Sequence, residues 1–205
     1  MTLPRRPFLL ASAAAAVAAF RPARAQSTQA PVAVVEGFHA VLLEVMRNAR
    51  SLGIRGRTGR LGPAMEAAFN LPAMTRIAVG PPWSGLSPSD QAALVRAFSE
   101  WSVATYADRF DGYGGEGFRT LGENPLPNGD RLVRTQLDRP RDAPVQLGYL
   151  LRESDGRWRI VDIYLTGTIS ELASRRAEFT TLLREGGAAR LVAELRARTE
   201  SLLRG

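Results

Sequence analysis

Residues 157–170 read RWRIVDIYLTGTIS, and the first ten of them have the composition of a buried β-strand. Successive side chains of a strand point to opposite faces, so strict alternation gives two sets. One face would carry Trp158, Ile160, Asp162 and Tyr164, and the other Val161, Ile163 and Leu165. Both faces would be covered, because a sheet with one wet face alternates apolar with polar residues. We therefore expect this strand to lie in a core or to form one wall of a cavity.

Three segments upstream have the same strand character and are separated by turn residues. The four candidate strands are residues 118–122, 131–138, 145–152 and 157–166. The last link contains Asp155-Gly156, and an Asp-Gly pair is among the strongest short hairpin signals. Short links between successive strands indicate an antiparallel meander. We expect a curved antiparallel sheet of four to five strands.

The rest of the chain has the periodicity of amphipathic helices. The first predicted helix begins at Pro31, and another begins at the cap sequence Ser87-Pro88-Ser89-Asp90. The others are expected at residues 60–69, 72–79, 170–184 and 188–203. About six helices packed with one antiparallel sheet define an α+β domain.

The first 25 residues have the three parts of an export signal. Arg5 and Arg6 precede an apolar run at residues 8–20, and Ala23-Arg24-Ala25 fits a cleavage site. That run is too short for a membrane helix, which needs about 20 residues. We expect a cleaved signal at 1–25, a single domain at 26–205, and a location outside the cytoplasm. The Arg pair also fits the twin-arginine type of signal, so both export routes stay open.

The charge balance gives little indication of a polyanionic partner. The chain has a net charge of +7, but residues 1–25 carry four Arg and no acidic residue, so the remainder is only +3. All 27 basic residues are Arg. A mild excess of this size does not indicate nucleic-acid binding.

The inventory of reactive side chains is small. Cysteine is absent, which excludes disulfides and thiolate chemistry. His39 is the single histidine, and no Ser-His-Asp set or metal-ligand spacing accompanies it. We expect His39 to be an ordinary residue at the surface or the edge of the core, and we expect no cofactor and no metal.

Asp162 and Tyr164 are the one pair with catalytic potential. An Asp base and a Tyr donor in an apolar cavity would suit a small isomerase or hydrolase. The alternative is structural, because a buried carboxylate must be paired. We favour an anchor held by a backbone amide or by one of Arg134, Arg152 and Arg159.

Aromatic and aliphatic side chains in both halves of the chain can form either a filled core or the wall of a cavity. The candidate lining residues are Phe69, Met74, Phe98, Trp101, Tyr106, Val133, Leu147, Tyr149, Ile163 and Tyr164. Gly167 is expected to end the last long strand, as a structural residue beside Asp162.

The order of these segments resembles the MlaC-type periplasmic lipid-binding family, also called the toluene-tolerance family. The resemblance is carried by AFNLPAMTRIAVGPPWSGLSPSDQAALVRAFSEWSVATYADRF at residues 68–110 and by GRWRIVDIYLTGTISELASRRAEFTTLLREGG at 156–187. SVATYADRFDGYGGEGF and YLTGTISELASRR look closest to the HpnM branch, which is associated with hopanoid biosynthesis.

The resemblance implies a non-enzymatic periplasmic carrier with a lipid cavity between helices and a curved sheet. Its ligand would be a phospholipid or a hopanoid. Its transient partners would be an inner-membrane ABC transporter complex and an outer-membrane lipid complex. The isomerase or hydrolase reading, with Asp162 and Tyr164 in the same cavity, remains the alternative.

Overall fold

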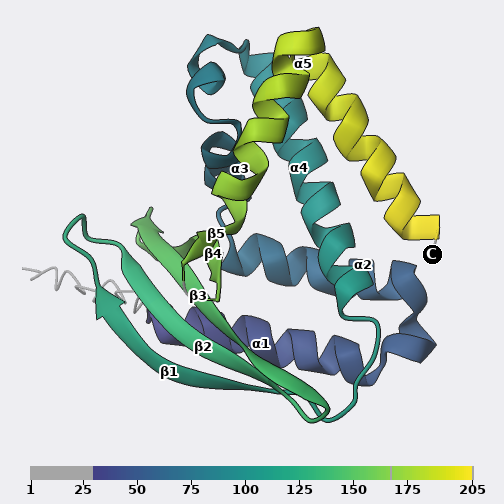
Figure 1. Ribbon diagram of the computed structural model, residues 1–205, viewed down its shortest axis with the longest axis vertical. Coiled ribbons are helices and arrows are strands. Elements are labelled where there is room, and N and C mark those ends of the chain that lie inside the picture. Colours follow the sequence, from purple (N-terminus) through teal and green to yellow (C-terminus); the bar gives the residue numbers. More distant parts are fainter. Residues whose placement is uncertain (1–29, 167, 205) are drawn as a thin grey trace, which may run out of the picture.

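The computed structural model describes residues 30–166 and 168–204, and it has the predicted α+β architecture (Figure 1). The helical half comes first. It contains α1 (Pro31–Arg47), α2 (Ala49–Ala68), α3 (Leu71–Val79), the short 3-10 helix η1 (Pro81–Gly85) and α4 (Pro88–Arg109). The predicted signal at 1–25 and the predicted strand end at Gly167 lie outside the described residues.

The second half is a sheet followed by a long helical segment. The strands are β1 (Gly117–Pro125), β2 (Arg131–Arg139), β3 (Asp142–Ser154), β4 (Arg157–Leu165) and β5 (Ile169–Ser170), and α5 spans Glu171–Arg204. The five strands form one antiparallel sheet in the order β1-β2-β3-β4-β5. The predicted meander is therefore confirmed, with a fifth strand of two residues.

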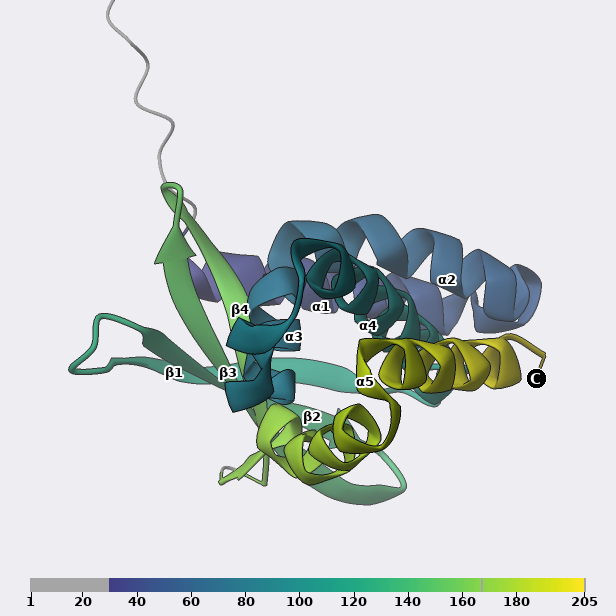
Figure 2. The same cartoon turned by 90° about the horizontal axis from the view of Figure 1, so that it is seen from above.

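The helices are not all placed alike relative to the sheet. Helix α1 lies along the sheet and contacts β1, β2 and β4, whereas α3 and α5 meet the sheet at β4 and form a second group with α4 that extends away from it (Figures 1 and 2). The two groups are joined at the centre of the molecule. There Phe69 forms a parallel bridge with Ile160, and the Asn70 amide donates to the Ile160 carbonyl over 2.8 Å.

Two helix boundaries show where local signals decide structure and where they do not. The Ser87 hydroxyl accepts from the Asp90 amide at 3.1 Å, as the cap sequence predicts. The predicted helix at 60–69 is wrong at its start, because α2 begins at Ala49 and is kinked at Gly53, with φ 58°. Its many glycines disfavour helix locally, but Arg57 donates to the Ala107 carbonyl of α4 at 2.7 Å, so tertiary contacts hold it.

Helix α5 is bent sharply at Gly186 and Gly187, as the two predicted helices require. Gly187 has φ 65° and ψ −165°, a conformation that is strained for any residue with a Cβ. The two arms of α5 fold back on each other beside α4 (Figure 1).

The assignment of side chains to the two faces of β4 is wrong beyond Ile160. Ile160 pairs with Leu151 and Asp162 with Leu150, so Val161 is an extra residue in a β-bulge. Ile163 pairs with Tyr149, two residues from Leu151 on β3. Ile160 and Ile163 therefore share the helix-facing side, and Asp162 and Tyr164 point to the other face.

No helix among the described residues is long and apolar enough to cross a membrane.

Candidate functional site

A cavity of about 450 Å³ lies between the sheet and the helices α3, α4 and the start of α5. Its volume falls within the range of ligand pockets, about 300–1,000 Å³. The lining is largely apolar, and its deepest part is made by buried side chains. We call this part the buried wall, and it comprises Met65, Phe69, Met74, Phe98, Trp101, Leu137, Tyr149, Ile163 and Leu172.

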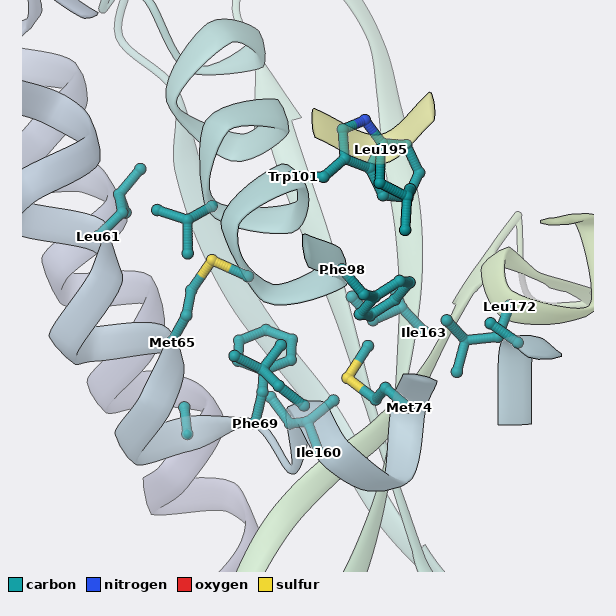
Figure 3. Close-up of a cluster of buried hydrophobic side chains, with 14 of the residues drawn as sticks. Leu61, Met65, Phe69, Met74, Phe98, Trp101, Ile160, Ile163, Leu172 and Leu195 are labelled. Atoms are coloured by element: carbon teal, nitrogen blue, oxygen red, sulfur yellow. The ribbon is translucent and has the colours of Figure 1, made fainter. Parts of the chain in front are cut away.

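The buried wall draws on both the helices and the sheet. Figure 3 shows Met65 from α2, Phe98 from α4 and Ile163 from β4 within one cluster of buried side chains. Aromatic pairs fix its geometry: the rings of Phe98 and Trp101 pack edge to face at 5.9 Å, and those of Phe38 and Phe69 at 4.8 Å. Rigid side chains of this kind line the cavity without closing it.

Four solvent-accessible charged residues are among the remaining lining residues, and we call them the rim. They are Arg109 at the end of α4, Arg139 at the end of β2, and Glu171 and Arg175 in the first turns of α5. None of these four residues was predicted from the sequence to line the cavity. Their position next to apolar segments was the only signal, and many other charged residues of this chain have the same position.

The three rim arginines differ in how they are held. Within the described residues, Arg109 and Arg175 form no salt bridge and no hydrogen bond. The Arg175 guanidinium lies 5.1 Å from the centre of the Trp101 ring, over the cavity wall. Arg139 is fixed at its turn, where Nη2 donates to the Ala143 carbonyl at 2.6 Å and Nη1 lies 3.9 Å from Asp142.

Eight of the ten predicted lining residues are found in the cavity wall; their contact with a ligand remains a prediction. They are Phe69, Met74, Phe98, Trp101, Tyr106, Leu147, Tyr149 and Ile163. Val133 and Tyr164 do not line it. Val133 pairs with Tyr149 but is 0% exposed within the closed core, and Tyr164 points to the opposite face of β4 because of the bulge.

His39 is buried behind the wall, which corrects the expectation of a surface or core-edge residue. It is 4% exposed, its Nε2 lies 2.9 Å from the Tyr149 hydroxyl, and its ring stacks on Phe118 at 3.8 Å. Burial lowers the pKa of His39 to about 4 and raises the pKa of Tyr149 well above its ordinary value. At neutral pH the phenol can therefore donate to an uncharged imidazole, which holds one side chain of the wall in place.

Tyr106 is the cavity-lining hydroxyl without such a partner. Burial raises the pKa of its phenol, while the nearby Arg109 lowers it and Glu171 raises it. Among the described residues its hydroxyl makes no hydrogen bond, whereas Ser102 and Thr105 bond to carbonyls of their own helix, those of Phe98 and Trp101. Tyr106 thus offers a polar group between the buried wall and the rim.

Asp162 is held as an anchor, although none of the three suggested arginines holds it. Its carboxylate accepts from the Ile163 amide at 2.8 Å and from the Ser170 hydroxyl at 2.6 Å, with a longer contact of 3.5 Å from the Leu172 amide. Ser170 in turn accepts from the Ala173 amide at 2.9 Å and caps α5. Asp162 therefore joins the bulge of β4 to the start of α5, where a negative charge is favoured by the helix dipole.

The geometry does not favour acid–base chemistry in the cavity. Asp162 and Tyr164 are absent from its wall. The one buried histidine is engaged by Tyr149. Within residues 30–166 and 168–204 no group of three or more His, Asp or Glu side chains is arranged to hold a metal ion.

A second cavity of about 350 Å³ lies between α2, α4 and the C-terminal arm of α5. Its lining includes Glu66, Glu100 and three hydroxyl side chains beside Leu71, Val103 and Leu203. It lacks the deep aromatic wall of the first cavity, which is the better candidate for an apolar ligand.

The fold, a helical half joined to an antiparallel meander, also occurs in a solved structure. This is the phospholipid-binding protein from Ralstonia solanacearum, in complex with a phospholipid. The fold matches with a TM-score of 0.72 at 20% sequence identity, over 83% of this chain and 97% of that chain. No curated protein matches the sequence.

The family is shown by the sequence itself. The model of the MlaC protein family matches residues 38–197, which contain every residue that lines the cavity. The chain belongs to the MlaC family.

Proposed function

We propose that this chain is a non-enzymatic lipid carrier of the periplasm. One observation carries the proposal: a cavity with a buried aromatic and aliphatic wall and a charged rim, in a fold shared with a protein solved with a phospholipid. Such a cavity suits a molecule with an apolar body and a polar head. The absence of Asp162 and Tyr164 from its wall argues against the isomerase or hydrolase alternative.

A carrier of this kind needs no reactive group. Each exposed methylene costs about 0.8 kcal/mol in water, so a lipid with about 30 methylenes is held in its membrane by well over 20 kcal/mol. A cavity that imitates the bilayer interior makes exchange with a membrane nearly neutral in free energy. The direction of transport would then be set by docking partners.

The cavity volume suits one acyl chain. An apolar cavity of about 150 Å³ accommodates benzene, or about 25 Å³ per carbon. On this scale 450 Å³ corresponds to about 18 carbons. The remainder of a two-chain lipid would lie between the walls after a modest widening, or at the rim.

The export signal predicted at residues 1–25 supports a periplasmic location. We further propose that the chain passes lipid between an outer-membrane lipid complex and an inner-membrane ABC transporter complex, as the soluble component of that system. The assignment to the HpnM branch, with a hopanoid as ligand, stays a prediction from the sequence.

The test is to purify the exported protein from its own organism, or from a host that makes the same lipids, and to combine native mass spectrometry with organic extraction. We expect about one lipid per chain. A protein that is folded by circular dichroism but yields no lipid by either method contradicts the proposal.

A further inference from the structure

We infer that the rim is a binding site for the phosphate of a lipid with net negative charge, and that uncharged lipids are not the preferred cargo. The inference rests on the proposed carrier function and names its ligand class. It starts from the charges that line the cavity: Arg109, Arg139 and Arg175 against Glu171, a net charge of +2.

The first argument is that two of these arginines are available. Most arginines of this sheet are engaged, as where Arg152 donates to both oxygens of Asp130 at 2.9 and 2.6 Å. Arg109 and Arg175 have no such carboxylate among the described residues. The acidic side chain near Arg175, Glu178, is held by Arg198, which is the main reason that its pKa is lowered. Donors that are not satisfied internally favour an external anion.

The second argument is position. Arg175 lies over the face of Trp101, which is part of the buried wall, and Arg109 is close enough to Tyr106 to lower the pKa of its phenol. A lipid whose acyl chain packs against Trp101 and Phe98 would therefore have its polar headgroup beside both guanidinium groups. Arginine binds phosphate through parallel N–H donors, and such charge-assisted bonds are about twice as strong as neutral ones.

The third argument concerns selectivity among lipids. An uncharged lipid offers the guanidinium groups no anionic acceptor and leaves them partly desolvated. A phosphatidylglycerol satisfies them and lowers the net charge of +2. A phosphatidylethanolamine also carries a phosphate, but Glu171 is the single rim acid that can receive its ammonium group. The expected order of preference is anionic phospholipid, then zwitterionic phospholipid, then uncharged lipid.

The experiment loads lipid-free protein from vesicles that contain equal amounts of phosphatidylglycerol, phosphatidylethanolamine and diacylglycerol with identical acyl chains. The protein is recovered, and its lipid is quantified by mass spectrometry. For the unaltered chain we expect roughly tenfold enrichment of phosphatidylglycerol over diacylglycerol, which corresponds to about 1.4 kcal/mol. In the double variant Arg109→Gln, Arg175→Gln this enrichment should fall about tenfold while total loading persists.

The matched control is the double variant Arg96→Gln, Arg184→Gln. These two arginines lie on the same helices, α4 and α5, are exposed and do not line the cavity. The control removes the same charge and so detects general attraction to anionic vesicles, which should also weaken in high salt.

The outcomes separate the two proposals. A chain that loads no lipid contradicts the carrier function itself. A chain that loads all three lipids in the vesicle ratio, or prefers diacylglycerol, retains that function and overturns the rim site. Equal loss of enrichment in the rim variant and the control variant also overturns the rim site.

Discussion

The buried wall and the rim of the cavity differ in whether their polar groups have hydrogen-bond partners within the protein. Behind the wall, the Tyr149 hydroxyl is paired with His39, and the Asp162 carboxylate that anchors β4 is fully engaged. At the rim, Arg109 and Arg175 form no salt bridge and no hydrogen bond among the described residues. The difference indicates that the side chains of the wall stabilise the fold, whereas Arg109 and Arg175 at the rim are available to contact a ligand. Changes in the two regions should therefore affect different measurements.

The largest loss of stability is expected from Phe69→Ala in the buried wall. Phe69 is 2% exposed and packs against Phe38. Removing a buried phenyl ring typically costs about 3–5 kcal/mol. Urea denaturation followed by circular dichroism measures this loss. Leu165→Ala, at a half-buried lining position, serves as the control and should cost about 1 kcal/mol. Equal losses would show that the buried wall contributes no more to folding than the half-buried part of the lining.

The next effect is the dependence of stability on pH through His39. Its pKa is about 4 in the folded protein and near 6.5 in the unfolded chain, so protons bind the unfolded state more readily. Above pH 6.5 His39 is uncharged in both states and does not make the stability depend on pH. The free energy of unfolding falls as the pH drops from 6.5 to 4, by about 3 kcal/mol in total. His39→Gln should flatten the stability profile in this interval. An unchanged profile in that variant would assign the pH dependence to other groups.

A smaller loss is expected at the anchor, where Asp162→Ala removes the acceptor for Ser170 and for the Ile163 amide. Leaving such donors unsatisfied costs about 1–3 kcal/mol. Asp162→Asn keeps one carbonyl oxygen and should lose about half as much. If both variants are as stable as the unaltered chain by urea denaturation, the carboxylate has no structural role.

The smallest change in stability and the largest change in loading are expected together in Leu147→Asp. Leu147 is half-buried and lines the cavity. A carboxylate there remains near solvent, so the free energy of unfolding should change by only about 1 kcal/mol, but it should reduce lipid loading at least tenfold. The matched control is Gln146→Asp, because Gln146 is the adjacent residue and its side chain is exposed. A folded Leu147→Asp protein that loads normally would remove Leu147 from the binding surface.

Those parts of the fold that depend on residues adjacent in the sequence could be predicted from it. Ser87 and Pro88 mark the start of α4, and Asp155-Gly156 marks the β3–β4 turn, because caps and turns are local. The start of α2 could not be predicted in this way. Its glycines weaken the helix, and Arg57 stabilises it through the Ala107 carbonyl, which lies 50 residues further along.

The candidate site was predicted in its apolar part and missed in its charged part. Hydrophobic residues such as Phe98 and Tyr149 are identified by periodicity, and periodicity follows burial. Arg109, Arg139 and Arg175 come together only through the packing of α4, β2 and α5. In a chain with 27 arginines, composition gives no means of choosing these three.

The extra residue Val161 makes the cavity sensitive to the length of β4 rather than to its exact composition. A conservative substitution at Val161 leaves Ile163 and Leu165 facing inward. Because Val161 is the extra residue, its deletion would remove the bulge and leave Ile160, Asp162 and Ile163 on the faces they already occupy. Insertion of one more residue would instead turn the positions between the insertion and β5 to the other face. We therefore expect single-residue insertions in 160–163 to be far more damaging than deletion of Val161 or conservative substitutions at the same positions. An insertion scan of this strand, compared with the Val161 deletion and the substitutions by the yield of folded protein, measures that difference.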